Sequence, residues 1–195
     1  ECGDHLAAGV NLMLLPASSI GMATAGMTSV TGRCHTFDSR ADGFCRGEGC
    51  SAAVIRIGEG GAVWCMIARG SAVRQDGRSA SLTAPNGQAQ QGLLRGALQD
   101  ASLQPHAIAA HEAHGTGTAL GDPIEAGSLV AAVLSARDEA LAVGGVKANI
   151  GHAEPAAGMT GLLRLVLGLR QGAATPNAQL RIWRCLTRTQ SESKF

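Results

Sequence analysis

The fold of this chain is constrained most by two segments in which an apolar run, a glycine-rich loop with a histidine, and a proline-started helical pattern follow one another. The first apolar run, 107–110, leads into the loop that carries His114. Gly115, Gly117 and Gly121 interrupt regular structure there, because glycine is favoured where φ is positive or where a ligand approaches the backbone closely. The sequence therefore predicts a buried strand that ends in a loop, the place where open α/β sheets position their sites.

The helix after this loop has clear start signals. Asp122 is a favourable N-cap, Pro123 suits the first helical position, and Glu125 falls at the third. Apolar residues then recur at helical spacing: Ala126, Leu129, Val130, Val133 and Leu134. We therefore expect a helix with one buried face and with its acidic residues at the cap.

The same order of features occurs a second time. An apolar run at 141–146 is followed by a polar loop that ends at His152, and Pro155 again fits the first position of a helix. The expected apolar stripe of that helix is Met159, Leu162, Leu163, Val166 and Leu167, with Gly172 at its end. If both apolar runs are strands of one sheet, their loops leave it at one edge, and His114 and His152 should lie close together.

These segments resemble the two histidine motifs of β-ketoacyl synthases, and most closely those of the ketosynthase domains of type I polyketide synthases. The two motifs are Glu112-Ala-His-Gly-Thr-Gly-Thr118 with Gly121-Asp-Pro-Ile-Glu125, and Val146-Lys-Ala-Asn-Ile-Gly-His152. Further matches in the same order are Gly9-Val-Asn-Leu-Met-Leu14, Phe37-Asp-Ser-Arg-Ala-Asp-Gly-Phe44, Arg46-Gly-Glu-Gly-Cys50, Gln75-Asp-Gly-Arg78 and Leu82-Thr-Ala-Pro-Asn-Gly87. Several motifs in one order carry far more weight than a lone His-Gly-Thr-Gly.

The resemblance implies a partial thiolase-like fold of the layered α/β/α type over residues 1–180. The segment 181–195 lacks a hydrophobic period, and we expect it to be a divergent, poorly ordered tail. The implied reaction is an acyl transfer, the decarboxylative Claisen condensation of an acyl thioester with a malonyl-carrier protein. The implied partner is an acyl carrier protein, and the complete domain is expected to be a homodimer without a tightly bound cofactor.

The resemblance also implies roles for individual residues. His114 and His152 would act as catalytic donors to the enolate oxygen that forms as carbon dioxide departs, since imidazoles donate or accept protons near neutral pH. Lys147 would supply positive charge and orient the second loop. Thr116 and Thr118 would bind the amides of the phosphopantetheine arm. Four other histidines are interpreted as structural or exposed: His5, His35, His106 and His111.

The nucleophile of the family is missing from this sequence. In β-ketoacyl synthases it is the cysteine of an Asp-Thr-Ala-Cys-Ser-Ser stretch, located before the segment that 9–14 matches, and no such stretch occurs here. Cys2 lacks that context, and Cys45 and Cys50 are interpreted as small buried residues. Because the chain also starts at Glu1 in sequence typical of mid-domain, we expect a carboxyl-side fragment or a truncated gene model. The alternative is a truncated, non-catalytic relative that binds an acyl carrier arm or another partner.

The remaining segments have simpler patterns. The expected elements are a buried strand at 10–15, a helix or loop lining the site entrance at 16–31, a solvated crossing loop with internal ion pairs at 32–49, strands at 51–57 and 62–67, and an amphipathic helix at 88–101.

Composition narrows the class of function. A net charge of +1 and only 3% aromatic residues argue against a nucleic-acid-binding surface. The longest apolar run, 165–169, is too short to cross a membrane. The six scattered cysteines form no zinc-binding pattern, so no metal is expected, and they indicate reduced thiols inside a cell. We expect a cytoplasmic location, with the plastid as the alternative.

Overall fold

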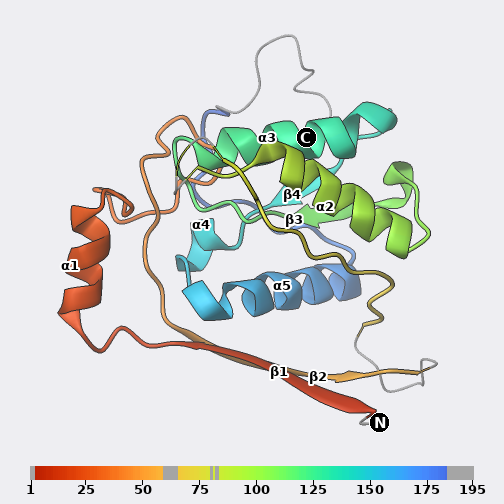
Figure 1. The fold of residues 1–195 in the computed structure, drawn as a ribbon, viewed down its shortest axis with the longest axis horizontal. Helices are drawn as coiled ribbons and strands as arrows, with labels where there is room; N and C mark the ends of the chain where they lie inside the picture. The colour runs from red at the N-terminus through yellow and green to blue at the C-terminus, as the bar shows by residue number, and fades with distance from the viewer. Residues whose placement is uncertain (1–2, 59–65, 80, 82–83, 184–195) are drawn as a thin grey trace.

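A computed structural model describes residues 3–58, 66–79, 81 and 84–183 of the chain (Figure 1). The described strands form two pairs: β1 (Asp4–Asn11) runs antiparallel to β2 (Gly49–Arg56), and β3 (Ala110–Glu112) runs parallel to β4 (Ala142–Gly144). The α-helices are α1 (Pro16–Thr24), α2 (Gly87–Asp100), α3 (Gly121–Ala132), α4 (Lys147–Ile150) and α5 (Ala157–Gln171). Short 3-10 turns are η1 (Pro105–Ala107), η2 (Leu134–Ala136) and η3 (Glu154–Ala156).

The elements are arranged in layers (Figure 1). Helix α5 lies between the β1–β2 pair and the β3–β4 pair and contacts strands of both. Helices α2 and α3 pack against one another on the other side of β3 and β4. This order confirms the layered α/β architecture expected from the sequence, in partial form. No helix in the described part of the chain is long and apolar enough to span a membrane.

The parallel pairing of β3 with β4 positions the candidate site. His111 is opposite Val143, and Glu112 is opposite Gly144. The loops that follow the two strands therefore leave the sheet at the same edge, as predicted. The strand expected at 107–110 begins only at Ala110, because the turn η1 occupies Pro105–Ala107.

The largest core cluster forms where α3 packs on α2. Its buried residues are Leu129, Ala132, Val133, Leu134 and Leu141, with Leu94 and Leu98 of α2 against them. The apolar face predicted for α3 is thus confirmed, although the helix itself ends at Ala132 and η2 continues the face. The predicted amphipathic helix at 88–101 is confirmed as α2, and the Asn86 side chain caps it by accepting from Gln88 N and Ala89 N.

Two predictions of buried apolar surface were wrong. In the strand expected at 10–15, Val10 and Leu14 are 51% and 79% exposed, and the segment 12–15 is not a strand. On α5, Met159, Leu162 and Val166 of the expected stripe are half-buried, but Leu163 and Leu167 are exposed, and the buried residues of the helix are Ala157 and Gly161. An apolar stripe shows that a face can be buried, but it does not show that other residues of this chain pack against it. The end of α5 at Gly172, which has φ 62°, agrees with the prediction.

The segment 32–49 is largely buried, and the prediction of a solvated loop was wrong. Residues 34–38 are all buried, and the Asp38 side chain is fully inaccessible. The expected internal ion pair does exist, because Arg40 Nε donates to Asp38 Oδ1 at 2.6 Å. The predicted strand at 51–57 is confirmed as β2, whereas most of the strand predicted at 62–67 lies outside the described residues.

The start of the expected tail is packed against this buried segment. Asp38 Oδ2 accepts from Arg181 N at 2.5 Å and from Ile182 N at 3.0 Å, and the Trp183 ring lies 5.3 Å from that of Phe37. The expectation of a poorly packed segment is therefore wrong for residues 181–183. Residues 184–195 lie outside the described residues, and the domain boundary at residue 180 remains a prediction.

A matched pair of glycine substitutions tests how tightly the first histidine loop packs. Gly117 has φ +80°, and an added Cβ would lie 2.6 Å from His35 N, so Gly117→Ala should lower the free energy of unfolding by at least about 2 kcal/mol. Gly127 lies in α3 with open space around it, and Gly127→Ala should raise that free energy by about 0.5–1 kcal/mol. Urea denaturation measures both. Equal effects of the two substitutions would contradict the packing described.

Candidate functional site

The two motif histidines lie side by side. His114 follows β3, His152 follows α4, and their ring centroids are 5.7 Å apart with the ring planes at 88°. The prediction that the parallel strands bring these side chains together is confirmed. At this spacing one small oxygen can lie within hydrogen-bonding reach of both imidazoles.

The His152 ring is oriented by its surroundings. Its Nδ1 accepts a hydrogen bond from Glu154 N at 3.1 Å, so the neutral ring carries its proton on Nε2. The His152 backbone donates to Cys45 O at 2.7 Å and accepts from Gly47 N at 2.9 Å. The Phe44 ring meets the imidazole edge-on at 5.3 Å. His152 therefore presents an N–H donor on a ring whose position is fixed on several sides.

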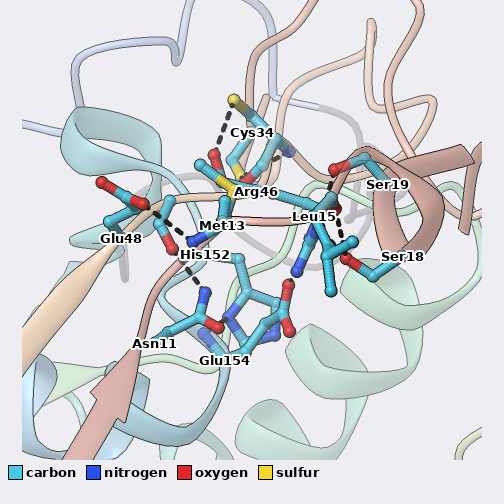
Figure 2. A network of polar contacts seen from close by, with 12 residues as sticks. Asn11, Met13, Leu15, Ser18, Ser19, Cys34, Arg46, Glu48, His152 and Glu154 are labelled. Atoms are coloured by element: carbon cyan, nitrogen blue, oxygen red, sulfur yellow. Dashed lines mark hydrogen bonds and ion pairs between the residues drawn. The ribbon is translucent and has the colours of Figure 1, made fainter.

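The loop around His152 is tied to two other parts of the chain by Arg46 (Figure 2). Arg46 Nε donates to Glu154 Oε1 at 2.7 Å, and its Nη1 donates to the Ser18 and Ser19 hydroxyls of α1. The Arg46 side chain is only 9% exposed. Sequence reasoning missed this role, because it assigned Arg46 to a solvated loop. The available signal was the position of Arg46 inside a family motif.

Two carboxylates of α3 hold the loop around His114. Glu125 accepts from His114 N at 2.6 Å and from Gly115 N at 2.8 Å. Asp122, 1% exposed, accepts from Gly117 N and Thr118 N, and also from Phe37 N at 2.7 Å. The prediction of Asp122 as the N-cap was wrong, since Leu120 is the cap and Gly121 the first helical residue. Both carboxylates accept hydrogen bonds from backbone amides of the loop, and these bonds restrict the backbone conformation around His114.

The two threonines of the loop have different surroundings. Thr116 is 7% exposed, and its hydroxyl lies 3.5 Å from that of Thr118. The Thr118 hydroxyl also accepts from Gly121 N at 3.1 Å and so supports the start of α3. Their predicted contact with a phosphopantetheine arm remains a prediction.

Lys147 adds a buried cation beside the histidines. It is 5% exposed, and burial lowers the pKa of its ammonium, while the nearby Glu125 and Glu112 carboxylates oppose that shift. Burial and the Lys147 charge lower the pKa of His114. Burial, Lys147 and His114 lower the pKa of His152 to about 4. Both imidazoles are therefore neutral at pH 7, and a neutral imidazole can donate one N–H to an oxygen that gains negative charge.

The thiols of the described chain do not complete this site. Cys34, Cys45 and Cys50 are free, and burial raises the pKa of the Cys34 thiol. Cys34 is buried, Cys45 is half-buried and Cys50 is exposed, so the prediction of a buried Cys50 was wrong. A nucleophilic cysteine needs a lowered thiol pKa, as at a helix N-terminus. Among the described residues no group of His, Cys, Asp and Glu side chains is arranged to hold a metal ion.

The lowered histidine pKa values predict how stability depends on pH. Burial also lowers the pKa of His111, to about 4. Between pH 4 and about 6.5 the unfolded chain binds protons that folded His111 and His152 do not, so stability should rise with pH across this window and be lost as pH falls through it. Each histidine should contribute on the order of 1–3 kcal/mol.

Urea denaturation at pH 4.5 and pH 7 measures this dependence. His111→Gln should reduce the difference in unfolding free energy between the two pH values, whereas His106→Gln changes an exposed position and serves as the control. Identical pH dependence in the wild type and in His111→Gln would contradict the prediction.

Known proteins are similar to this chain over most of its length. Residues 65–181 match the family model of the β-ketoacyl synthase C-terminal domain, and residues 1–59 match that of the N-terminal domain. One subunit of the phenolphthiocerol/phthiocerol polyketide synthase of Mycobacterium tuberculosis is 46% identical over 184 residues, which are 91% of this chain and 10% of that protein. Another subunit of the same synthase is 47% identical over 179 residues, 88% of this chain and 8% of that protein.

Solved ketosynthase structures share the fold. The ketosynthase from module 6 of the bacillaene synthase of Bacillus subtilis superimposes with a TM-score of 0.88 and 32% identity, over 98% of this chain and 35% of that one. An oxazolomycin ketosynthase domain of Streptomyces albus gives a TM-score of 0.84 and 33% identity, over 92% and 32% of the two chains. The chain thus spans about a tenth of these curated relatives and about a third of these solved domains. With the thiolase-like layered fold and the paired histidine motifs, these matches show that the chain belongs to the β-ketoacyl synthase family, among the ketosynthase domains of type I polyketide synthases.

Proposed function

We propose that this chain forms the histidine-bearing part of a ketosynthase that joins an acyl chain to a malonyl unit by decarboxylative condensation, with an acyl carrier protein as partner. The observation that supports the proposal most is the pair of imidazoles whose ring centroids lie 5.7 Å apart. We also propose that the complete domain is a cytoplasmic homodimer, as expected from the family.

The proposed chemistry uses the site as follows. The malonyl thioester loses carbon dioxide, and the electron pair of the broken carbon–carbon bond moves to the thioester oxygen as an enolate. The Nε2–H of His152, together with an N–H of His114, stabilises that oxygen. The enolate carbon then attacks an acyl thioester carried on the family's cysteine, and the thiolate leaves. Lys147 adds positive potential, and Thr116 and Thr118 bind the phosphopantetheine amides.

The test uses a ketosynthase domain that contains this chain together with a cysteine motif. Incubation with an acyl thioester and a malonyl-carrier protein should release carbon dioxide and form one β-ketoacyl thioester per carbon dioxide. Acylation of the cysteine without carbon dioxide release would contradict the proposal.

The 195-residue chain alone is expected to form no acyl-enzyme. Acyl transfer needs a thiolate placed against the donors, and a misplacement of about 1 Å can cost a hundredfold in rate. Incubation with a radiolabelled acyl thioester should therefore leave no label on any of the six cysteines, Cys2, Cys45 and Cys50 included. Specific labelling of one of them, lost on its change to Ala and dependent on His114, would show that the chain contains its own nucleophile.

We keep the alternative expected from the sequence as a second candidate function. In this alternative the chain is a non-catalytic relative that binds an acyl carrier arm or another partner. Binding of a malonyl-carrier protein with no decarboxylation, even when a cysteine motif is supplied, would favour this alternative over the enzymatic one.

A further inference from the structure

The glutamate at the end of β3 joins the two histidine loops. Glu112 Oε1 accepts from Val146 N at 2.6 Å, and Oε2 forms an ion pair with Arg164 Nη1 of α5. The Glu112 side chain is 5% exposed. Glu112 lies two residues before His114, and Val146 directly precedes Lys147 and α4. One carboxylate therefore connects the strand that leads to His114 with the turn that leads to Lys147 and His152.

The Arg164 guanidinium is fixed by hydrogen bonds to Thr175 as well as by the ion pair. Its Nε donates to the Thr175 hydroxyl at 2.7 Å, its Nη2 donates to Thr175 O at 2.6 Å, and its side chain is 15% exposed. The guanidinium consequently cannot follow a displaced carboxylate without breaking these bonds. The ion pair with Arg164 therefore fixes Glu112 Oε2, and this positions Oε1 to accept the hydrogen bond from Val146 N.

Two glycines provide the space for this arrangement. A Cβ at Gly144 would lie 2.8 Å from Arg164 Cζ, and a Cβ at Gly161 would lie 3.2 Å from Glu112 Cγ. Gly144 is the register partner of Glu112 in the parallel pair, and Gly161 is buried on α5. Side chains at either position would push the ion pair away from Val146.

We propose that Glu112 is a positioning residue of the two-histidine site, which acts through the Val146 N–H to hold Lys147 and the loop of His152 in register with the loop of His114. The carboxylate also supports the charged form of the nearby Lys147 ammonium. The consequence for catalysis rests on the proposed function, whereas the positioning role can be measured without any turnover.

The experiment records the imidazole tautomers and titration of His152 by NMR in the 195-residue chain. In the wild type, His152 should be the Nε2–H tautomer and titrate at about 4. Glu112→Ala removes the acceptor of Val146 N–H, so the loop should loosen, a second tautomer should appear, and the His152 pKa should rise by roughly one unit towards its ordinary value. Glu112→Gln keeps an oxygen for Val146 N–H and should preserve the wild-type tautomer.

Two further variants separate positioning from a purely structural ion pair. Arg164→Met removes the ion pair but leaves the Val146 N–H bond to Glu112, so the His152 tautomer should change less than in Glu112→Ala. Where Glu112→Ala does not fold, the double substitution Glu112→Leu with Arg164→Leu fills the interior without a charge and should shift His152 in the same way. Glu139→Gln, at an exposed position, is the control for a lost surface charge.

The outcomes decide between the two roles. An unchanged His152 in Glu112→Ala or in the double variant, or equal shifts in Glu112→Gln, Glu112→Ala and Arg164→Met, would overturn the inference. The proposed function is tested separately by malonyl decarboxylation in a ketosynthase domain that contains the chain. A shifted His152 with unaltered decarboxylation would contradict the catalytic role proposed for His152 and leave the positioning role intact. A wild-type domain that releases no carbon dioxide would contradict the proposed function without affecting the positioning role.

Discussion

Asp122→Ala should lower the free energy of unfolding by about 3–5 kcal/mol, because it leaves three backbone N–H groups without this acceptor, at about 1–1.5 kcal/mol each, the low end of the usual range for a buried donor. These donors belong to Gly117 and Thr118 of the first histidine loop and to Phe37 of the buried segment 34–38. Asp122 is 1% exposed, so water cannot easily replace the lost carboxylate. The loss is a large part of the roughly 5–15 kcal/mol that stabilises an ordinary domain, so roughly a third of the stability would disappear.

Urea denaturation followed by far-ultraviolet circular dichroism measures this effect. Asp122→Asn keeps one acceptor oxygen and should cost less than Asp122→Ala. Asp42→Ala, at an exposed aspartate, is the matched control and should change the unfolding free energy by no more than about 0.5 kcal/mol. A cost below about 1 kcal/mol for Asp122→Ala would show that the loop does not depend on these hydrogen bonds.

His114→Ala and His152→Ala should each lower malonyl decarboxylation by a factor of about 10²–10³ in a ketosynthase domain that contains this chain, the loss typical for one donor to a developing oxyanion. The physical reason is that each neutral ring supplies one N–H to the same oxygen, and water in the vacated space is not preorganised. The double variant should lose less than the product of the two factors, because the residues act as a unit.

The release of labelled carbon dioxide from a malonyl thioester measures these rates. His106→Ala, on the exposed turn η1, is the control and should leave the rate unchanged. A loss of less than about tenfold in both motif variants would mean that neither histidine stabilises the enolate.

The main features of the candidate site could be predicted from local patterns. Each apolar run ended in a glycine-rich polar loop and a proline-started helix, and parallel strands place such loops at one edge. The closeness of His114 and His152 followed from that reasoning alone. The fold class needed the family motifs in addition, because two short strands on their own are compatible with many sheets.

The supporting contacts could not be predicted in the same way, because they join residues far apart in the chain. Arg46 reaches Glu154 across 108 positions, and Arg164 reaches Glu112 across 52. A charged residue in a glycine-rich segment has the same local pattern whether it is exposed or buried in an ion pair. The hydrogen-bond partners of the Asp122 carboxylate were missed for a related reason. An acidic residue in the first turn can cap its own helix or accept from the loop before it, and both cases have the same local sequence pattern.

Exposed apolar surface was missed because periodicity does not indicate what covers a face. Leu6 is opposite Val54 in the β1–β2 pair, and both are exposed, although the pattern of either strand is compatible with burial. The chain spans about a third of the solved ketosynthase domains that it matches. A helical or strand pattern shows which residues share a face, but it does not identify the residues that pack against that face.

The histidines are proposed to act on the malonyl unit and not on the thiol, and one measurement tests this role most directly. In His152→Ala of a ketosynthase domain that contains this chain, the rate of cysteine acylation by a radiolabelled acyl thioester is compared with the rate of carbon dioxide release. We predict acylation within a few fold of the wild type, while decarboxylation falls by about 10²–10³. Acylation that falls in parallel with decarboxylation would contradict this role, because His152 would then be needed at the thiol.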